Sequence, residues 1–134
     1  MPREGNGVAG ERNLTSISRK WANILGLAHW DISVRWANKK DIEEMGYADA
    51  DVRFRPCGER AAIRVKRKED CDLLEGENGY DVEELIVHEL LHLVFAHFPG
   101  GEPDGLKTDL FDTGIDRVAR CLVKLRGGRD KDVL

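Results

Sequence analysis

Two periodicities of apolar and polar residues along the chain predict an α+β fold. Residues 30–36, 51–55 and 61–67 alternate between apolar and polar side chains, which is typical of half-buried strands. Residues 56–58, between the last two strands, form a predicted hairpin turn. Apolar residues at helical spacing predict helices at residues 16–25, 82–98 and 108–125. The expected order is therefore one helix, about three strands and two further helices.

The second predicted helix is the most apolar part of the chain. Asp81 is a candidate N-cap with Glu84 three residues later, and Pro99 provides a stop. His88 and His92 project away from its broad apolar stripe, which consists of Val82, Ile86, Leu90, Leu93 and Val94. We therefore expect a helix that is buried on most sides, with both histidines lining an internal cleft.

This helix contains the run His88-Glu89-Leu90-Leu91-His92. Residues four apart share a helix face, so both imidazoles can bind one metal ion with Glu89 beside it. The alternative is an ordinary core helix, but that requires two ligand-type residues and an acid to coincide by chance. A catalytic zinc needs a third protein ligand. His97 points roughly 140° away from His92 around the helix, so we interpret it as structural.

The third predicted helix carries an acidic stripe beside its apolar one. Thr108 is its candidate cap, and two glycines at 127–128 are its expected end. Asp109, Asp112 and Asp116 lie at positions i, i+3 and i+7, so one acid could bind the metal while another orients a ligand histidine. The alternative interpretation of this stripe is a solvated helix face.

These two helices resemble the gluzincin branch of the zincin metallopeptidases, in particular its minimal members and the small enzymes of phages and bacteria. In that family a second helix supplies a ligand acid with an Asp four residues later, and Asp112-Thr113-Gly114-Ile115-Asp116 fits this pattern. The resemblance implies a zincin-like fold with a small mixed sheet. It also implies one Zn²⁺ per chain, held by His88, His92 and Asp112, with Asp116 as the partner of a ligand histidine.

One departure from the family pattern concerns the third ligand. The family usually has Glu where this chain has Asp112, which is one methylene shorter, so the helices must approach more closely. Gly114 could permit that approach. Asp109 remains the alternative ligand.

The expected function is hydrolysis of a peptide or protein substrate, with Glu89 as general base. A different class is a restrained zinc-bearing regulatory or binding module of the phage or bacterial immunity type, inhibited by residues 126–134 lying in the cleft. The resemblance also suggests that strand 61–67 pairs with substrate, with Arg64 and Lys66 on its exposed face; protection of a sheet edge is the alternative. The net charge of −4 argues against nucleic-acid binding, the third class.

Length and composition limit the organisation of the chain. With 134 residues, 41% hydrophobic and 34% charged, we expect one domain at 14–127, a flexible segment at 1–13 and a tail at 128–134. No apolar run is long enough to span a membrane, and no signal-peptide core is evident, so we expect a cytoplasmic protein. Three cysteines without paired spacing predict free thiols. The oligomeric state is left open.

Overall fold

The computed structural model describes residues 2–55, 57–71, 79–96 and 105–132, with side chains for 13–55, 57–71, 79–96 and 112–127. Within these ranges the chain forms four α-helices, one short 3-10 helix and a three-stranded mixed sheet, so the predicted α+β class is confirmed. In chain order the elements are α1 (Pro2–Ile24), β1 (Asp31–Trp36), α2 (Lys39–Met45), β2 (Ala50–Arg55), β3 (Arg60–Val65), η1 (Lys68–Asp70), α3 (Val82–Val94) and α4 (Gly105–Asp132).

The three strands are those that the alternating pattern predicts. Their spatial order is β1-β3-β2, with β1 parallel and β2 antiparallel to β3. The β2–β3 hairpin runs in register from Ala50 opposite Val65 to Arg55 opposite Arg60, which confirms the predicted turn. Because β3 has a strand on each side, neither of its edges is open to a peptide. The expectation that residues 61–67 pair with substrate was therefore wrong.

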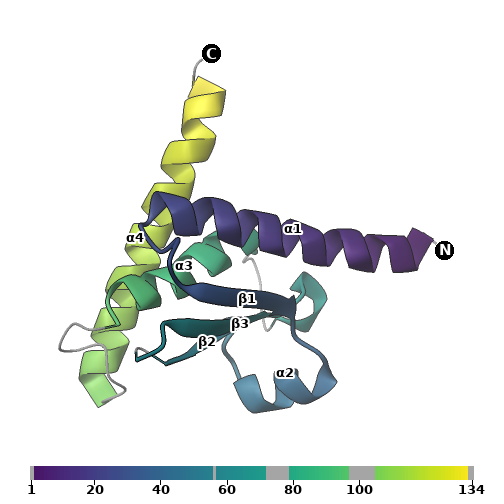
Figure 1. Cartoon of the computed structure of the whole chain (residues 1–134), viewed down its shortest axis with the longest axis horizontal. Coiled ribbons are helices and arrows are strands. Elements are labelled where there is room, and N and C mark those ends of the chain that lie inside the picture. The colour runs from purple at the N-terminus through teal and green to yellow at the C-terminus, as the bar shows by residue number, and fades with distance from the viewer. Residues whose placement is uncertain (1, 56, 72–78, 97–104, 133–134) are drawn as a thin grey trace.

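The core lies on one face of the sheet, where α1 and α3 pack (Figure 1). Ile63 and Val65 point from β3 to this face because alternate residues of a strand share a side. The apolar stripe of α3 is buried against them, with Ile86 and Leu90 at 0% exposure. α4 packs on α3, and its C-terminal half extends past α1 in the view of Figure 1.

The opposite face of the sheet is partly covered by α2, a helix that the apolar periodicity did not reveal. Its first turn is closed by a capping box in which Asp41 N donates to Asn38 Oδ1 and Asn38 N donates to Asp41 Oδ2, both at 2.9 Å. Arg64 reaches up from β3 beneath this helix, with its guanidinium 3.2 Å from Asp41 Oδ1 and 2.8 Å from Glu44 Oε1. Nη2 of Arg64 also donates to Oδ2 of Asp51, on β2, at 2.7 Å.

The predicted exposure of Arg64 and Lys66 was consequently wrong. The Arg64 side chain is 7% exposed, and three carboxylates surround it. Lys66 is 2% exposed, and its Nζ donates to the Gly46 carbonyl, at the end of α2, at 2.6 Å. Both basic side chains are buried because α2 supplies their partners. The interpretation of this strand as an exposed basic face is excluded.

Two helices extend beyond their predicted ends. α1 begins at Pro2 rather than near residue 16, because Pro is compatible with the first helical turn and each added residue gains a backbone hydrogen bond. Mobility of residues 1–13 stays a prediction. α4 begins at Gly105, which places Thr108 inside the helix and not at its cap. It continues through Gly127, since the cost of a helical glycine, about 1 kcal/mol, is small beside the cooperativity of a 28-residue helix.

The helical tail bears on the predicted autoinhibition. Asp132 lies twenty residues beyond Asp112 on the same helix, which is roughly 30 Å along its axis. A tail in this conformation is far from the histidines of α3. Cys57, Cys71 and Cys121 are free thiols, as predicted. None of the helices in the described part of the chain combines the length and apolar character needed to span a bilayer.

Candidate metal centre

α3 presents both histidines of the motif on one face. Asp81 caps the helix, because its Oδ1 accepts hydrogen bonds from the backbone N–H groups of Glu83 at 3.0 Å and Glu84 at 3.2 Å. From this cap the helix runs unbroken for 13 residues, so His88 and His92 are neighbours on its surface. Their side chains are 15% and 22% exposed. The predicted N-cap is confirmed, and the position of the histidines in a cleft stays a prediction.

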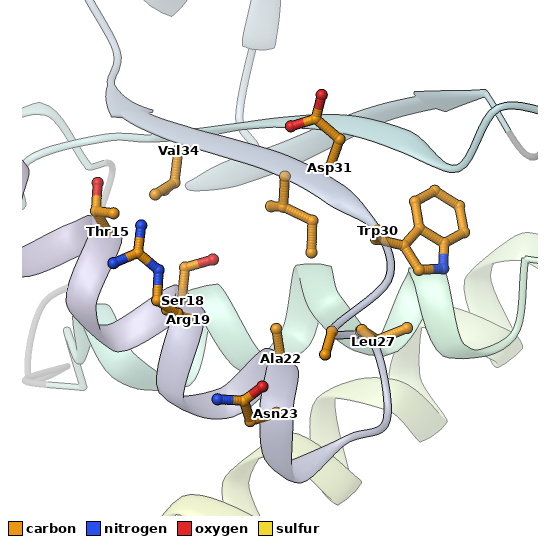
Figure 2. A pocket seen from close by; sticks show the side chains of 11 residues that line it. Thr15, Ser18, Arg19, Ala22, Asn23, Leu27, Trp30, Asp31 and Val34 are labelled. Carbon is orange, nitrogen blue, oxygen red and sulfur yellow. The ribbon is translucent and has the colours of Figure 1, made fainter.

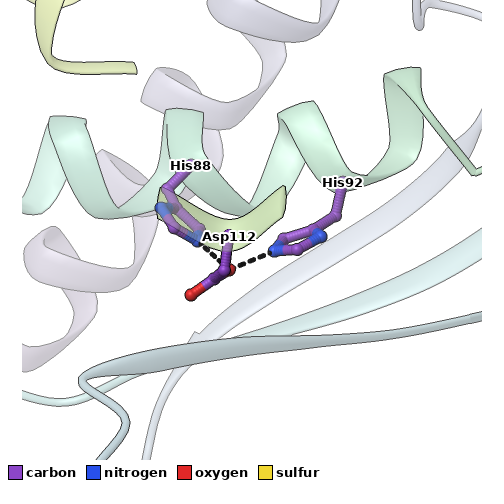
Figure 3. Close-up of side chains that lie close together, drawn as sticks. All are labelled: His88, His92 and Asp112. Atoms are coloured by element: carbon purple, nitrogen blue, oxygen red, sulfur yellow. Dashed lines mark hydrogen bonds and ion pairs between the residues drawn. The ribbon is translucent and has the colours of Figure 1, made fainter. Parts of the chain in front are cut away.

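α4 brings its acids to these histidines. Ile115 and Ala119 are buried at 3% and 0% exposure, which turns their face of α4 toward α3. Asp112 lies one turn before Ile115 and therefore reaches the same interface. Its Oδ1 lies 2.9 Å from Nε2 of His88 and 2.9 Å from Nε2 of His92, as Figure 3 shows. The three side chains that the resemblance grouped together thus meet at one point.

The three side chains form a group that could hold a metal ion. Two imidazole nitrogens and one carboxylate oxygen lie within 4.8 Å of one another, and these are ligand types that catalytic zinc uses. Ligand atoms about 2.0 Å from a tetrahedral ion are roughly 3.3 Å apart. To hold an ion, the 2.9 Å contacts of Asp112 would lengthen by a few tenths of an ångström, and separations of up to 4.8 Å within the group would shorten by about 1.5 Å. The Asp112 side chain is 51% exposed, so the centre opens to solvent on that side.

The second acid of α4 lies behind one of the histidines. Asp116 Oδ1 is 3.5 Å from Nδ1 of His88, the ring nitrogen that does not face Asp112. Asp116 is also held by Arg120, whose Nη2 donates to Oδ2 at 2.6 Å. This is the position that the resemblance assigned to Asp116, since a carboxylate on the far ring nitrogen fixes the orientation of a ligand histidine.

Glu89 is a buried acid next to the two histidines in sequence. It is 5% exposed, and burial raises the pKa of its carboxyl well above the usual value. The negative charges of Asp112 and Asp51 raise the pKa further. A carboxyl whose proton affinity is increased in this way is suited to accept and return a proton. The contribution of Asp51 was not foreseen, because only the folded hairpin brings β2 near α3.

Burial has the opposite effect on His92. It lowers the pKa of this imidazole, and the neighbouring His88 lowers it further, while Asp112 acts to raise it. A lowered pKa favours the neutral ring, which is the form that binds metal.

Two other predictions stay untested. His97 lies outside the described residues, as does the side chain of Asp109. Gly114 is exposed and an added Cβ would meet nothing within 4 Å, so the expectation that it permits close helix approach was wrong. It fails because Gly114 faces away from α3 and Ile115 faces toward it.

Side chains that could stabilise an oxyanion include Tyr47, Tyr80 and Arg117. Tyr47 is 87% exposed, and Arg117 is exposed on α4. The hydroxyl of Tyr80 donates to the Lys66 carbonyl at 2.8 Å. The geometry does not select one of them as a donor to a reacting group.

Comparison with known protein families, with curated proteins and with solved structures found no match to this chain.

Proposed function

We propose that this protein is a zinc-dependent metallopeptidase with a zincin-like fold of the gluzincin type. The observation that carries the proposal is the meeting of His88 Nε2, His92 Nε2 and Asp112 Oδ1 beside the buried carboxyl of Glu89. A site built only for structure would be closed by a fourth protein ligand. Here the described residues supply three ligand atoms and leave one side open, which suits catalysis better.

The chemistry needs both a Lewis acid and a base. A zinc ion at these ligands would polarise a peptide carbonyl and make water more acidic. His88 and His92 would bind through Nε2 and Asp112 through its carboxylate, with Asp116 holding the far side of the His88 ring. Glu89 would accept a proton from the attacking water and return it to the leaving amine.

The sheet offers a place for an extended substrate next to this site. β2 has β3 on one side and contacts α3, which carries the histidines. Within the described ranges no strand lies on its other side. We therefore assign to β2 the substrate-pairing role first expected of β3, through its free backbone N–H and C=O groups. The substrate class remains a peptide or protein, and we expect the protein to act in the cytoplasm.

The alternative function, a zinc-bearing regulatory or binding module, differs in one measurable respect. Both functions require zinc, but only a peptidase requires the proton transfer by Glu89. Zinc content and hydrolysis must therefore be measured on the same samples.

Hydrolysis of a mixed peptide library by zinc-loaded protein tests the proposal. We expect about one zinc per chain, loss of activity with a chelator and recovery on adding zinc. Glu89→Gln should retain zinc but lower kcat by roughly 10²–10⁴-fold, since it removes the general base. Glu84→Gln is the matched control on the same helix and should keep most activity. A zinc-loaded protein that cleaves no peptide in the library would contradict the peptidase and favour the binding module.

A further inference from the structure

A groove runs between α1 and β1 on the side of the sheet away from β2. In Figure 2 the side chains of α1 and β1 face one another across it. Its apolar surface includes Ile32, Val34 and Ala22. Its polar side chains are Asp31 of β1 and four from α1: Thr15, Ser18, Arg19 and Asn23. None of these residues belongs to the metal centre.

The edge of β1 that borders this groove has free backbone groups. Asp31 N donates to Glu59 O at 2.9 Å and Ala37 N donates to Val65 O at 2.8 Å, which places the odd-numbered residues of β1 toward β3. In a parallel pair the intervening residues point the other way. The N–H and C=O groups of Ile32 and Val34 therefore face the groove. An unpaired strand edge of this kind is a template for a further strand.

Ser18 is the most informative polar residue of the groove. It is 5% exposed and its side chain points toward β1 in Figure 2. Its hydroxyl has no hydrogen-bond partner among the described residues. The hydroxyl is not sealed from solvent, because the only side-chain polar atom among the described residues that is both buried and without a partner is Trp36 Nε1. Ser18 therefore offers a free hydrogen-bonding group on the wall of the groove, beside an open strand edge.

The charge along the groove selects the kind of ligand. Within the described part of the chain, no carboxylate lies within ion-pair distance of the Arg19 guanidinium. Asp31, the acid that lines the groove, has Arg60 Nε 3.8 Å from its Oδ2. The unmatched charge is therefore positive. An acidic group on the ligand would satisfy it.

The size of the groove favours a chain over a small molecule. Its volume is about 230 Å³. Pockets that enclose drug-sized molecules occupy roughly 300–1,000 Å³. The space instead suits one or two side chains of a peptide that lies across it.

We infer that this groove binds an extended acidic segment of a partner protein, which adds to the sheet as a strand beside β1. Its backbone pairs with Ile32 and Val34, and an acidic side chain reaches Arg19. A polar group of the segment hydrogen-bonds to the Ser18 hydroxyl. This site is on the opposite edge of the sheet from β2 and does not require catalysis.

Fluorescence anisotropy with a labelled peptide tests the inference. The probe is a seven-residue peptide of alternating valine and threonine with a central aspartate, and its ends are acetylated and amidated. A control peptide carries lysine in place of the aspartate. We expect the wild-type protein to bind the aspartate peptide roughly threefold to tenfold tighter at low salt, a preference that weakens with added salt. Every second residue of the peptide would pair its backbone N–H with β1. N-methylation of these residues should abolish binding, while N-methylation of the intervening residues should be tolerated.

Two variants assign the binding to this groove. Arg19→Glu should reverse the preference between the two peptides, because it replaces a positive charge in the groove with a negative one. Lys124→Glu makes the same charge change on the exposed surface of α4 and should leave the preference unchanged. Ser18→Leu fills the groove and should weaken both peptides, provided that its circular dichroism matches wild type.

The outcomes that overturn the inference are equally specific. They are no binding of either peptide by the wild-type protein, or binding that Arg19→Glu leaves unchanged. Because Arg19 is exposed, this variant stays informative even where Ser18→Leu fails to fold.

Discussion

Asp116 Oδ1 lies 3.5 Å from Nδ1 of His88, on the far side of the ring from Asp112. One imidazole of α3 is therefore flanked by two acids of α4, placed one turn apart. This relationship orients Nε2 toward the point where His92 and Asp112 also converge. It links the packing of two helices to the geometry of the candidate metal centre.

Asp116→Asn should weaken zinc binding about 10–100-fold, because the amide holds the His88 ring less firmly than the carboxylate does. Competition with a chromogenic chelator measures the change. Glu43→Gln, an exposed acid of α2, is the matched control and should bind zinc as wild type does. An unchanged affinity in Asp116→Asn would show that His88 needs no such partner.

Asp112→Asn should weaken zinc binding at least about 100-fold, because it removes a charged first ligand. Asp109→Asn, one turn earlier on α4, tests the rival ligand and should retain the ion. Metal analysis after dialysis separates the two cases. The opposite pattern, with zinc lost from Asp109→Asn alone, would assign the third ligand to Asp109.

The sequence contained enough information to predict the elements that form this centre. The capping residue Asp81 and the histidine spacing are local features, so α3 and its exposed face follow from neighbouring residues. The meeting of Asp112 with both histidines depends on how α4 packs on α3. It was expected only through the resemblance to a known family.

The environment of Arg64 illustrates what a one-dimensional pattern misses. Alternation along β3 correctly placed this residue on the face opposite the core, and that face was taken as solvent. The short helix α2 covers it, and α2 has too few apolar residues to reveal itself by periodicity. The pair Asn38 and Asp41 was a capping signal that could have revealed it.

Arg64→Met should lower the free energy of unfolding by about 1–3 kcal/mol, because Asp51 loses its ion-pair partner while Asp41 keeps Arg35. Arg53→Met is the control. Its side chain is 68% exposed and pairs with Glu44 at the surface, so the expected cost is below about 1 kcal/mol. Urea unfolding followed by circular dichroism gives both values. Equal losses would mean that the buried cluster adds nothing beyond a surface pair.

Acidification should destabilise the fold through Asp41. The hydrogen bonds from Arg35, Asn38 and Arg64 hold the pKa of this carboxyl far below its usual range. Its contribution to stability is therefore complete above the unfolded-state pKa, about 3.9, and is lost as the pH falls through the lower folded-state pKa. Urea unfolding at pH 7 and at pH 3 should show a loss that is smaller in Asp41→Asn. An equal loss in both proteins would remove Asp41 as a source of the acid sensitivity.

Anomalous diffraction at the zinc absorption edge, from crystals grown with zinc, tests the proposed centre most directly. We expect one strong peak, with Nε2 of His88 and His92 at about 2.0–2.1 Å and a carboxylate oxygen of Asp112 at about 2.0–2.2 Å. The absence of a peak between these residues, or a third ligand other than Asp112, would contradict the account.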